Sequence, residues 1–149
     1  MSKEIVYNID MNKRTHVAGA ITSSQEDYLE RIYDLSLIDE QVRSIDVARA
    51  LNVSRASVNK SLGGLKDDGY IEQEPYGTIT LTKKGRAIAK EVRTRHNALR
   101  AFLTQVLKVD YEIADKDACE MEHAISKHTA DKLYAYLKKL GITEKDTGK

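Results

Sequence analysis

The chain has 149 residues, 41% hydrophobic and 32% charged, a composition typical of a folded globular protein and not of a disordered one. No apolar run approaches the roughly 18 residues that a membrane helix needs, and the N-terminus lacks the pattern of a secretory signal. A lone cysteine excludes an internal disulfide, so we expect a cytoplasmic protein. The net charge of +1 hides a basic middle, since residues 41–100 carry 12 Lys and Arg against 6 Asp and Glu. This excess indicates either a polyanion partner or a solvated basic helix face.

The first clear apolar pattern predicts a helix over about 24–38. Ser23 and Glu26 have the spacing of a capping box. Apolar side chains follow at helical spacing, namely Tyr28, Leu29, Ile32, Tyr33 and Leu35. Asp27 and Glu30 fall on the other side of this helix, where a simple explanation for Asp27 is an exposed ion pair within the helix.

Two short helices in tandem are predicted next. Ser44 can cap the first, which runs to Leu51, and Ser54 can cap the second, which runs to about Asp67. Two such helices joined by a short turn are typical of the helix-turn-helix. The apolar residues expected to pack inward are Ile45, Val47, Ala48, Leu51, Val53, Val58, Leu62 and Leu65.

An alternating segment around the single proline predicts a β-hairpin, with Ile71 before the turn and Ile79 after it. A long helix is predicted over about 84–107, and His96 interrupts its apolar stripe. One or two helices over 109–128 and a last helix, with Leu133, Leu137 and Leu140 at helical spacing, complete the pattern.

The order helix, turn, helix, hairpin, helix is that of a winged helix-turn-helix, whose second helix enters the major groove of DNA. An arginine such as Arg55 can read guanine and an asparagine such as Asn59 can read adenine, while Tyr76 at the hairpin tip is placed to touch the backbone or minor groove. The sequence does not predict which bases are read. The full set of predicted DNA contacts is Ser54, Arg55, Ser57, Asn59, Lys60 and Tyr76. The alternative is a winged helix used only for protein contacts, which the basic middle of the chain disfavours.

A second group of residues has the chemistry of a metal site. Cys119, Glu122 and His123 share one helix face because i, i+3 and i+4 neighbours stack. This trio alone is a weak motif, since a lone cysteine is usually a small buried hydrophobe. Three predicted helices together offer six possible ligands, which are Asp27, Glu30, His96, Cys119, Glu122 and His123. The alternative is that each has an ordinary role in the core or on the surface.

Four blocks resemble, in order and spacing, the diphtheria toxin repressor family of metal-dependent transcriptional repressors, including its manganese transport regulator branch. The blocks are SQEDYLERIYDL, the helix-turn-helix, LTKKGRAIAKEVRTRH and CEMEH, which together span about residues 23–142. By position, the resemblance implies a primary metal site of Asp27, Cys119, Glu122 and His123. It implies a second site that involves Glu30 and His96, with Glu122 or Cys119 shared.

The chain departs from both branches of the family. The iron-responsive branch has a methionine where Asp27 stands, and the manganese branch has a glutamate where Cys119 stands. Arg100 takes the place of a second-site glutamate of the iron branch, which puts that branch's ancillary site in doubt. Asp, Glu and His ligands suit Mn²⁺ or Fe²⁺, whereas a thiolate favours Fe²⁺, Co²⁺ or Zn²⁺. The sequence leaves Mn²⁺ and Fe²⁺ open, with one or two ions per subunit.

We therefore expect a mainly α protein, with a winged helix-turn-helix DNA-binding domain followed by an all-helical metal-binding and dimerisation domain. The expected boundaries are a flexible arm over 1–22, the DNA-binding domain over 23–94, the helical domain over 95–143 and a tail over 144–149. The C-terminal half has more apolar surface than a small domain can hide, which predicts a homodimer on a palindromic double-stranded operator. The residues expected to supply this surface are Leu99, Phe102, Leu103, Leu133, Tyr134 and Leu137.

The predicted function is metal-dependent repression that controls manganese or iron homeostasis. The alternative is a winged-helix regulator that does not sense metal. We do not expect an enzyme, because Glu120-x-x-His123 resembles only half of a di-iron carboxylate motif, and no oxyanion or substrate loop is recognisable.

Overall fold

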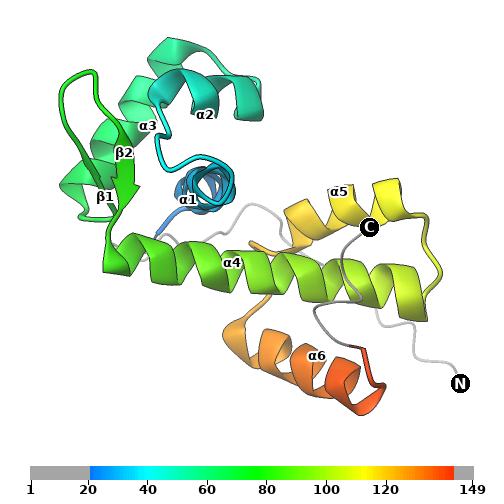
Figure 1. Ribbon diagram of the computed structural model, residues 1–149. Coiled ribbons are helices and arrows are strands. Elements are labelled where there is room, and N and C mark those ends of the chain that lie inside the picture. Colours follow the sequence, from blue (N-terminus) through cyan, green and yellow to red (C-terminus); the bar gives the residue numbers. More distant parts are fainter. Residues whose placement is uncertain (1–20, 143–149) are drawn as a thin grey trace, which may run out of the picture.

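The structure is a computed structural model that describes residues 21–142. The expected tail over 144–149, and the expected arm apart from Ile21 and Thr22, lie outside this range. None of the helices within it combines the length and the apolar character needed to cross a membrane. The elements in chain order are α1 (Ser23–Ser36), α2 (Ser44–Leu51), α3 (Arg55–Asp67), β1 (Ile71–Gln73), β2 (Ile79–Leu81), α4 (Lys83–Ala101), the π-helical turn η1 (Phe102–Val106), α5 (Tyr111–Met121) and α6 (Lys127–Lys139) (Figure 1).

The first half of the molecule is the predicted winged helix-turn-helix. α2 and α3 meet at Asn52, whose φ of 53° gives the left-handed turn between them. The two strands pair antiparallel, with Ile71 opposite Leu81. The interior of this half is apolar and includes Leu29, Ile32, Val47, Val58, Leu62, Leu65, Ile71 and Ile79. Burial of these side chains holds α1 against the helix-turn-helix and the hairpin.

Several local predictions in this half were wrong. The capping box of α1 is formed by Thr22 and Gln25, each of whose side chains accepts the other's backbone N–H. The same Ser/Thr-x-x-Glu/Gln spacing occurs one residue earlier than expected, and glutamine completes it equally well. The N-cap residue of α2 is Arg43 and not Ser44. The Arg43 N–H donates to the carboxylate of Asp46, the third residue of the helix.

Two apolar residues expected inside are partly outside. Ile45 is 37% exposed and Val53 is 40% exposed. Ile45 borders an open groove beside the hairpin, and Val53 lies in the turn between α2 and α3.

α4 is the long helix that connects the two halves of the molecule. It begins beside the hairpin, where Gly85 lies so close to the Tyr70 carbonyl that any larger residue would collide with it. α1 and α5 pack against α4, and α6 packs against its distal part (Figure 1). The predicted single helix over 84–107 ends in the π-helical turn η1, closed by the bond from Leu107 N–H to the Phe102 carbonyl.

The second half has a smaller apolar interior. Ala98, Ala101 and Leu137 form its buried centre, and the partly buried residues around them are Phe102, Val106, Leu133, Tyr134 and Ile142. Leu99, Leu103 and Leu137, three of the residues expected to supply the dimer surface, are instead buried within the chain. Leu140, the C-cap of α6, is 48% exposed.

Candidate metal centre and nucleic-acid interface

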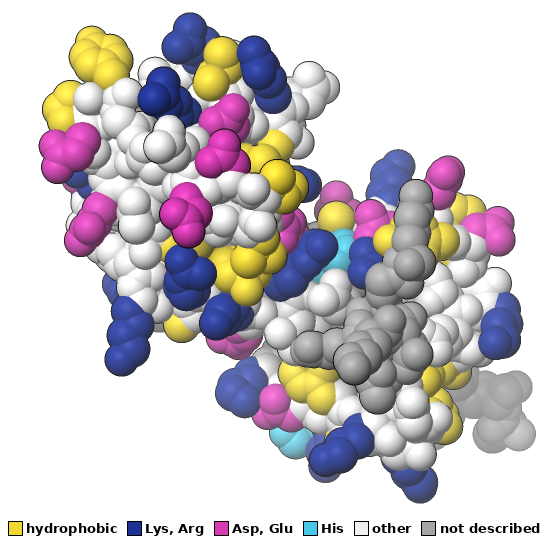
Figure 2. All heavy atoms as spheres, viewed as in Figure 1, with side chains coloured by type: hydrophobic (Ala, Val, Ile, Leu, Met, Phe, Trp, Pro, Cys, Tyr) yellow, Lys and Arg dark blue, Asp and Glu magenta, His cyan; other side chains and the backbone are white. Residues whose placement is uncertain are grey.

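Two clusters of potential metal ligands lie where α1, α4 and the end of α5 meet. Asp27, Glu122 and His123 form the outer cluster, and Glu30, His96 and Glu122 form the inner cluster. In each cluster, one ligand atom per residue lies within 4.8 Å of the others. Glu122 belongs to both, so the two clusters form one continuous centre. Figure 2 shows the halves of the molecule as two lobes, with part of a histidine and neighbouring basic and acidic side chains visible at their junction.

Helical spacing accounts for the placement of these ligands. Asp27 and Glu30 lie one turn apart on α1 and face the same neighbours. Glu122 is the C-cap of α5 and keeps helical backbone angles, so His123 leaves the helix end beside it. His96 comes from the last third of α4, the helix against which both α1 and α5 pack.

The outer cluster is partly open to solvent. His123 Nε2 lies 2.6 Å from Asp27 Oδ1 and 3.3 Å from Glu122 Oε1. Its Nδ1 lies 3.4 Å from Glu26 Oε2, an oxygen that also accepts from Arg95 Nη2 at 2.7 Å. Burial lowers the pKa of His123, but hydrogen bonds to Asp27 and Glu26 and the charges of Asp27 and Glu122 outweigh it and raise that pKa to about 10.

The inner cluster is buried. Glu30 is 7% exposed, His96 2% and Glu122 1%. Burial, and then the charge of Glu122, raises the pKa of Glu30 from 4.5 to about 7. Burial lowers the pKa of His96, but hydrogen bonds to Cys119, Glu122 and Asp115 raise it to about 10 overall. Glu30, expected on the polar side of α1, therefore faces the interior, because α4 and α5 cover that side.

The donor set of this centre fits a divalent cation. Glu30 Oε2 is buried and has no hydrogen-bond partner among the described residues. The charges of His96 and Arg93 lower the pKa of Glu30, but Arg93 Nη1 lies no closer than 3.9 Å to Glu30 Oε1. Buried carboxylates without a close cation are costly, and carboxylate oxygens with imidazole nitrogens are ligands that suit Mn²⁺ and Fe²⁺.

Cys119 lies beside the inner cluster. Its Sγ is 3.7 Å from His96 Nδ1, and it does not group with Asp27 and His123, the residues with which it was expected to form the primary site. The residue is exposed. A thiol at this position is accessible and next to an imidazole that points into the inner cluster.

The sequence analysis did not identify four charged residues that lie next to the histidines of the centre. Glu26 contacts both His123 and Arg95, and Asp115 contacts both His96 and Arg100. Weak signals existed, since Arg100 follows His96 by one helical turn and Asp115 precedes Cys119 by one turn. Nothing in the spacing shows which of the many charged residues on these helices would meet.

The predicted DNA-contacting residues lie on one exposed surface. The residues at the start of α3 are all exposed, namely Ser54, Arg55, Ser57, Asn59 and Lys60. The Ser54 hydroxyl caps α3 by accepting the Ser57 N–H at 3.1 Å. Tyr76 is fully exposed at the hairpin tip. Its φ of 57° is a backbone conformation that residues other than glycine rarely adopt.

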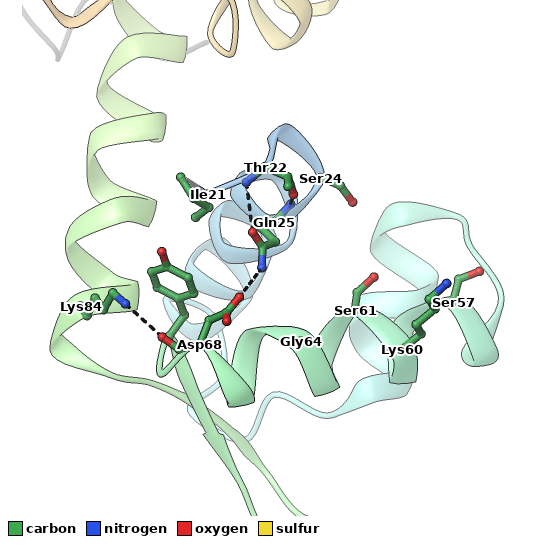
Figure 3. Close-up of a pocket in the computed structure, with 11 residues that line it drawn as sticks. Ile21, Thr22, Ser24, Gln25, Ser57, Lys60, Ser61, Gly64, Asp68 and Lys84 are labelled. Carbon is green, nitrogen blue, oxygen red and sulfur yellow. Dashed lines mark hydrogen bonds between the residues drawn. The ribbon is translucent and has the colours of Figure 1, made fainter. Parts of the chain in front are cut away.

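Open grooves flank α3 on two sides. One, of about 520 Å³, lies between α3 and the hairpin and is bordered by Arg55, Asn59 and Tyr76. The other, of about 740 Å³, lies between α3 and the start of α1, with Lys60 on one wall (Figure 3). α3 therefore projects from the molecule with both flanks accessible, as a helix that enters a DNA groove requires.

Comparisons with known proteins place the chain in a family. The N-terminal DNA binding domain of iron dependent repressors matches residues 20–79, and their metal binding and dimerisation domain matches residues 82–145. The chain is 34% identical over 120 residues to an HTH-type transcriptional regulator of Methanocaldococcus jannaschii, covering 80% of this chain and 96% of that one. It is 39% identical over 118 residues to the transcriptional regulator MntR of Salmonella typhimurium, covering 79% and 74%.

Solved structures agree with this assignment. The manganese regulator SloR matches with a TM-score of 0.70 at 27% identity, over 83% of this chain and 56% of that one. A manganese-dependent transcriptional repressor in complex with manganese matches with a TM-score of 0.68 at 26% identity, over 80% and 53%. The chain thus spans about half the length of these two proteins. With both domains matched in order and the winged helix and metal-ligand clusters in place, this protein belongs to the diphtheria toxin repressor family of metal-dependent transcriptional repressors.

Proposed function

We propose that this protein is a cytoplasmic homodimeric repressor that binds a palindromic operator when its centre holds Mn²⁺ or Fe²⁺, and so controls manganese or iron homeostasis. The observation that carries the proposal is the continuous centre around Glu122. Its ligands come from α1, which is part of the winged-helix half, and from α4 and the end of α5, which extend into the other half.

The centre links metal binding to the position of α3. Asp27 and Glu30 lie on α1, and the other face of α1 packs through Leu29 and Ile32 into the core that holds α3. A bound divalent cation would supply the positive charge that brings these carboxylates and the α4 and α5 ligands to a common point. The ligands of α1 would then hold the winged helix in one orientation against α4, which sets the direction of α3.

We assign different ligands to the two clusters. The outer cluster offers only oxygen and nitrogen, from Asp27, Glu122 and His123, which is the donor set that Mn²⁺ favours. The inner cluster offers Glu30, His96 and Glu122, and we place Cys119 with it because its Sγ lies beside His96. The sulfur favours Fe²⁺, Co²⁺ or Zn²⁺ over Mn²⁺ at the inner position.

The apolar surface of the C-terminal half supports a dimer. Phe102 and Tyr136 meet edge to face with ring centroids 6.5 Å apart, and Tyr136 is still 46% exposed. Leu107 and Leu140 are 55% and 48% exposed. An isologous pairing through this surface would present two copies of α3 to the two halves of a palindrome.

The direct test is operator binding by the purified protein with chelator, and then with Mn²⁺, Fe²⁺ and Zn²⁺ added separately. We expect tight, sequence-specific binding only with metal, and a dimer by light scattering at micromolar concentration. Equal DNA binding with and without metal would support the alternative, a winged-helix regulator that does not sense metal. A monomer would contradict the proposed assembly.

The DNA side of the proposal predicts different effects at two positions of α3. Arg55→Ala should lose roughly 1–3 kcal/mol of specific binding and relax the base preference at one position per half-site. Lys60→Ala should weaken binding to all sequences alike and lower the salt dependence by about one unit per site. Titrations of operator and random DNA at several salt concentrations separate the two, and identical losses on both DNAs for Arg55→Ala would remove its assignment as a base reader.

A further inference from the structure

Both ring nitrogens of His96 have a carboxylate partner, and only one of these partners belongs to the metal centre. Nδ1 lies 2.8 Å from Glu122 Oε2, inside the inner cluster. Nε2 lies 2.8 Å from Asp115 Oδ1, on the opposite edge of the ring. Asp115 is in neither cluster of potential ligands. The His96 ring is therefore held between the centre and a carboxylate outside it.

Asp115 is itself fixed in place. The oxygen that faces His96 also accepts from Arg100 Nη1 at 2.7 Å. The Arg100 guanidinium lies 5.2 Å from the centroid of the Tyr111 ring and is 9% exposed. Arg100 follows His96 by one turn of α4, so α4 carries both the histidine and the cation that anchors the histidine's partner.

We propose that Asp115, anchored by Arg100, is a positioning residue for metal binding at His96, an inference that rests on the proposed metal-sensing function. A histidine ligand must be neutral, with a proton on one nitrogen and a lone pair on the other. Asp115 accepts a hydrogen bond from the Nε2–H group and so keeps the proton of the neutral ring on Nε2. The lone pair is then on Nδ1, the nitrogen that faces Glu122 and Cys119, and Nδ1 can bind metal. Such carboxylate–histidine pairs fix the tautomer and orientation of metal-binding imidazoles in other proteins.

The charge of Arg100 explains why Asp115 does not act as a ligand instead. A carboxylate beside a metal centre competes for the cation unless another positive charge holds it. The guanidinium of Arg100 provides this charge and directs the shared oxygen toward His96 Nε2. Arg100 thus acts as an anchor for the carboxylate that orients His96.

The test uses the full-length protein with Zn²⁺, which is diamagnetic and allows NMR of the histidine rings. Asp115→Ala removes the acceptor, and Asp117→Ala is a matched control that removes an exposed carboxylate from the same helix. The Asp115 side chain is 41% exposed, so its truncation leaves no buried cavity. We expect a roughly 10- to 100-fold loss of Zn²⁺ affinity at one site for Asp115→Ala and none for Asp117→Ala.

Long-range ¹H–¹⁵N spectra of the zinc-bound protein supply a measurement that a purely structural role would not change. We expect His96 to be protonated at Nε2 in the wild type and to lose this single tautomer in Asp115→Ala, with His123 unchanged. Wild-type affinity in Asp115→Ala, or an unchanged His96 tautomer, would overturn the inference alone. Absence of Zn²⁺, Mn²⁺ and Fe²⁺ binding by the wild type would instead overturn the proposed function on which it rests.

Discussion

The outer and inner clusters share Glu122 but differ in their surroundings. In the outer cluster the Asp27 side chain is 50% exposed, whereas all three inner residues are 7% exposed or less. An exposed carboxylate keeps its hydration when no cation is present, but a buried one does not. Without metal, carboxylate burial therefore costs more free energy in the inner cluster than in the outer cluster. The outer cluster is the part of the centre that is more accessible to an ion from solvent.

The histidines of the two clusters have similar surroundings, but the lengths of their contacts differ. Each histidine meets a carboxylate outside the ligand set, and an arginine of α4 holds each carboxylate. Glu26 and Arg95 serve His123, with a distance of 3.4 Å between Glu26 and the ring. At His96 the corresponding distance to Asp115 is 2.8 Å. The buried histidine is thus the more firmly oriented of the two, and ligand substitutions can test this difference.

Substitution of Glu122, the shared ligand, should have the largest effect because it affects both clusters. Glu122→Gln should reduce the affinity for Mn²⁺ and Fe²⁺ by about 100-fold or more and abolish metal-dependent operator binding. Isothermal titration and DNA-binding assays measure the two effects. Glu120→Gln, at an exposed neighbour outside both clusters, is the matched control and should behave as the wild type. Loss of only one of two sites would show that Glu122 is not shared.

Substitution of Cys119 should separate the two clusters. Cys119→Ser keeps the size but removes the soft donor, so Co²⁺, Zn²⁺ and Fe²⁺ should bind roughly 10-fold more weakly while Mn²⁺ affinity changes less. The wild type with Co²⁺ should show a thiolate charge-transfer band in the near ultraviolet, and the variant should lack it. If Co²⁺ binds the wild type without that band, Cys119 is not a ligand and the centre consists of oxygen and nitrogen alone.

Substitution of Glu30 should have a smaller effect, which is a change in the free energy of unfolding of the metal-free protein. The folded protein raises the pKa of Glu30 from 4.5 to about 7, so it holds this proton more tightly than the unfolded chain. The contribution of Glu30 to the stability of the metal-free protein should therefore fall as pH rises from about 4.5 to about 7 and stay lower above that range. Glu30→Gln should remove this dependence and raise the free energy of unfolding at pH 8 by on the order of 1 to 2 kcal/mol.

Urea unfolding in chelator at pH 5 and pH 8 measures the difference. Glu40→Gln, at an exposed carboxylate beyond the end of α1, is the control and should show no comparable gain. Equal stability of the wild type and Glu30→Gln at pH 8 would mean that burial of this carboxylate costs nothing, and the contrast between the clusters would lose its main support.

Local pattern was sufficient to determine the order of the elements. Period, capping residues and turn residues predicted α1, the helix-turn-helix, the hairpin and α4 close to their observed bounds, because these features depend on neighbours within a few positions. The errors were also local, such as the capping box that begins at Thr22 and the exposed Ile45. The residues Asp27, Glu30, His96, Glu122 and His123 were named from their chemistry and spacing before any contact was known.

Which helix faces meet was decided only by the tertiary structure. Asp27 and His123 are 96 positions apart, and their contact depends on how α1 and α5 pack against α4. The same packing buries Glu30, puts Cys119 beside His96 and brings Asp115 to the far edge of that ring. Helical period specifies a face of each helix, but the partner of that face follows from the burial of apolar surface by all the helices together.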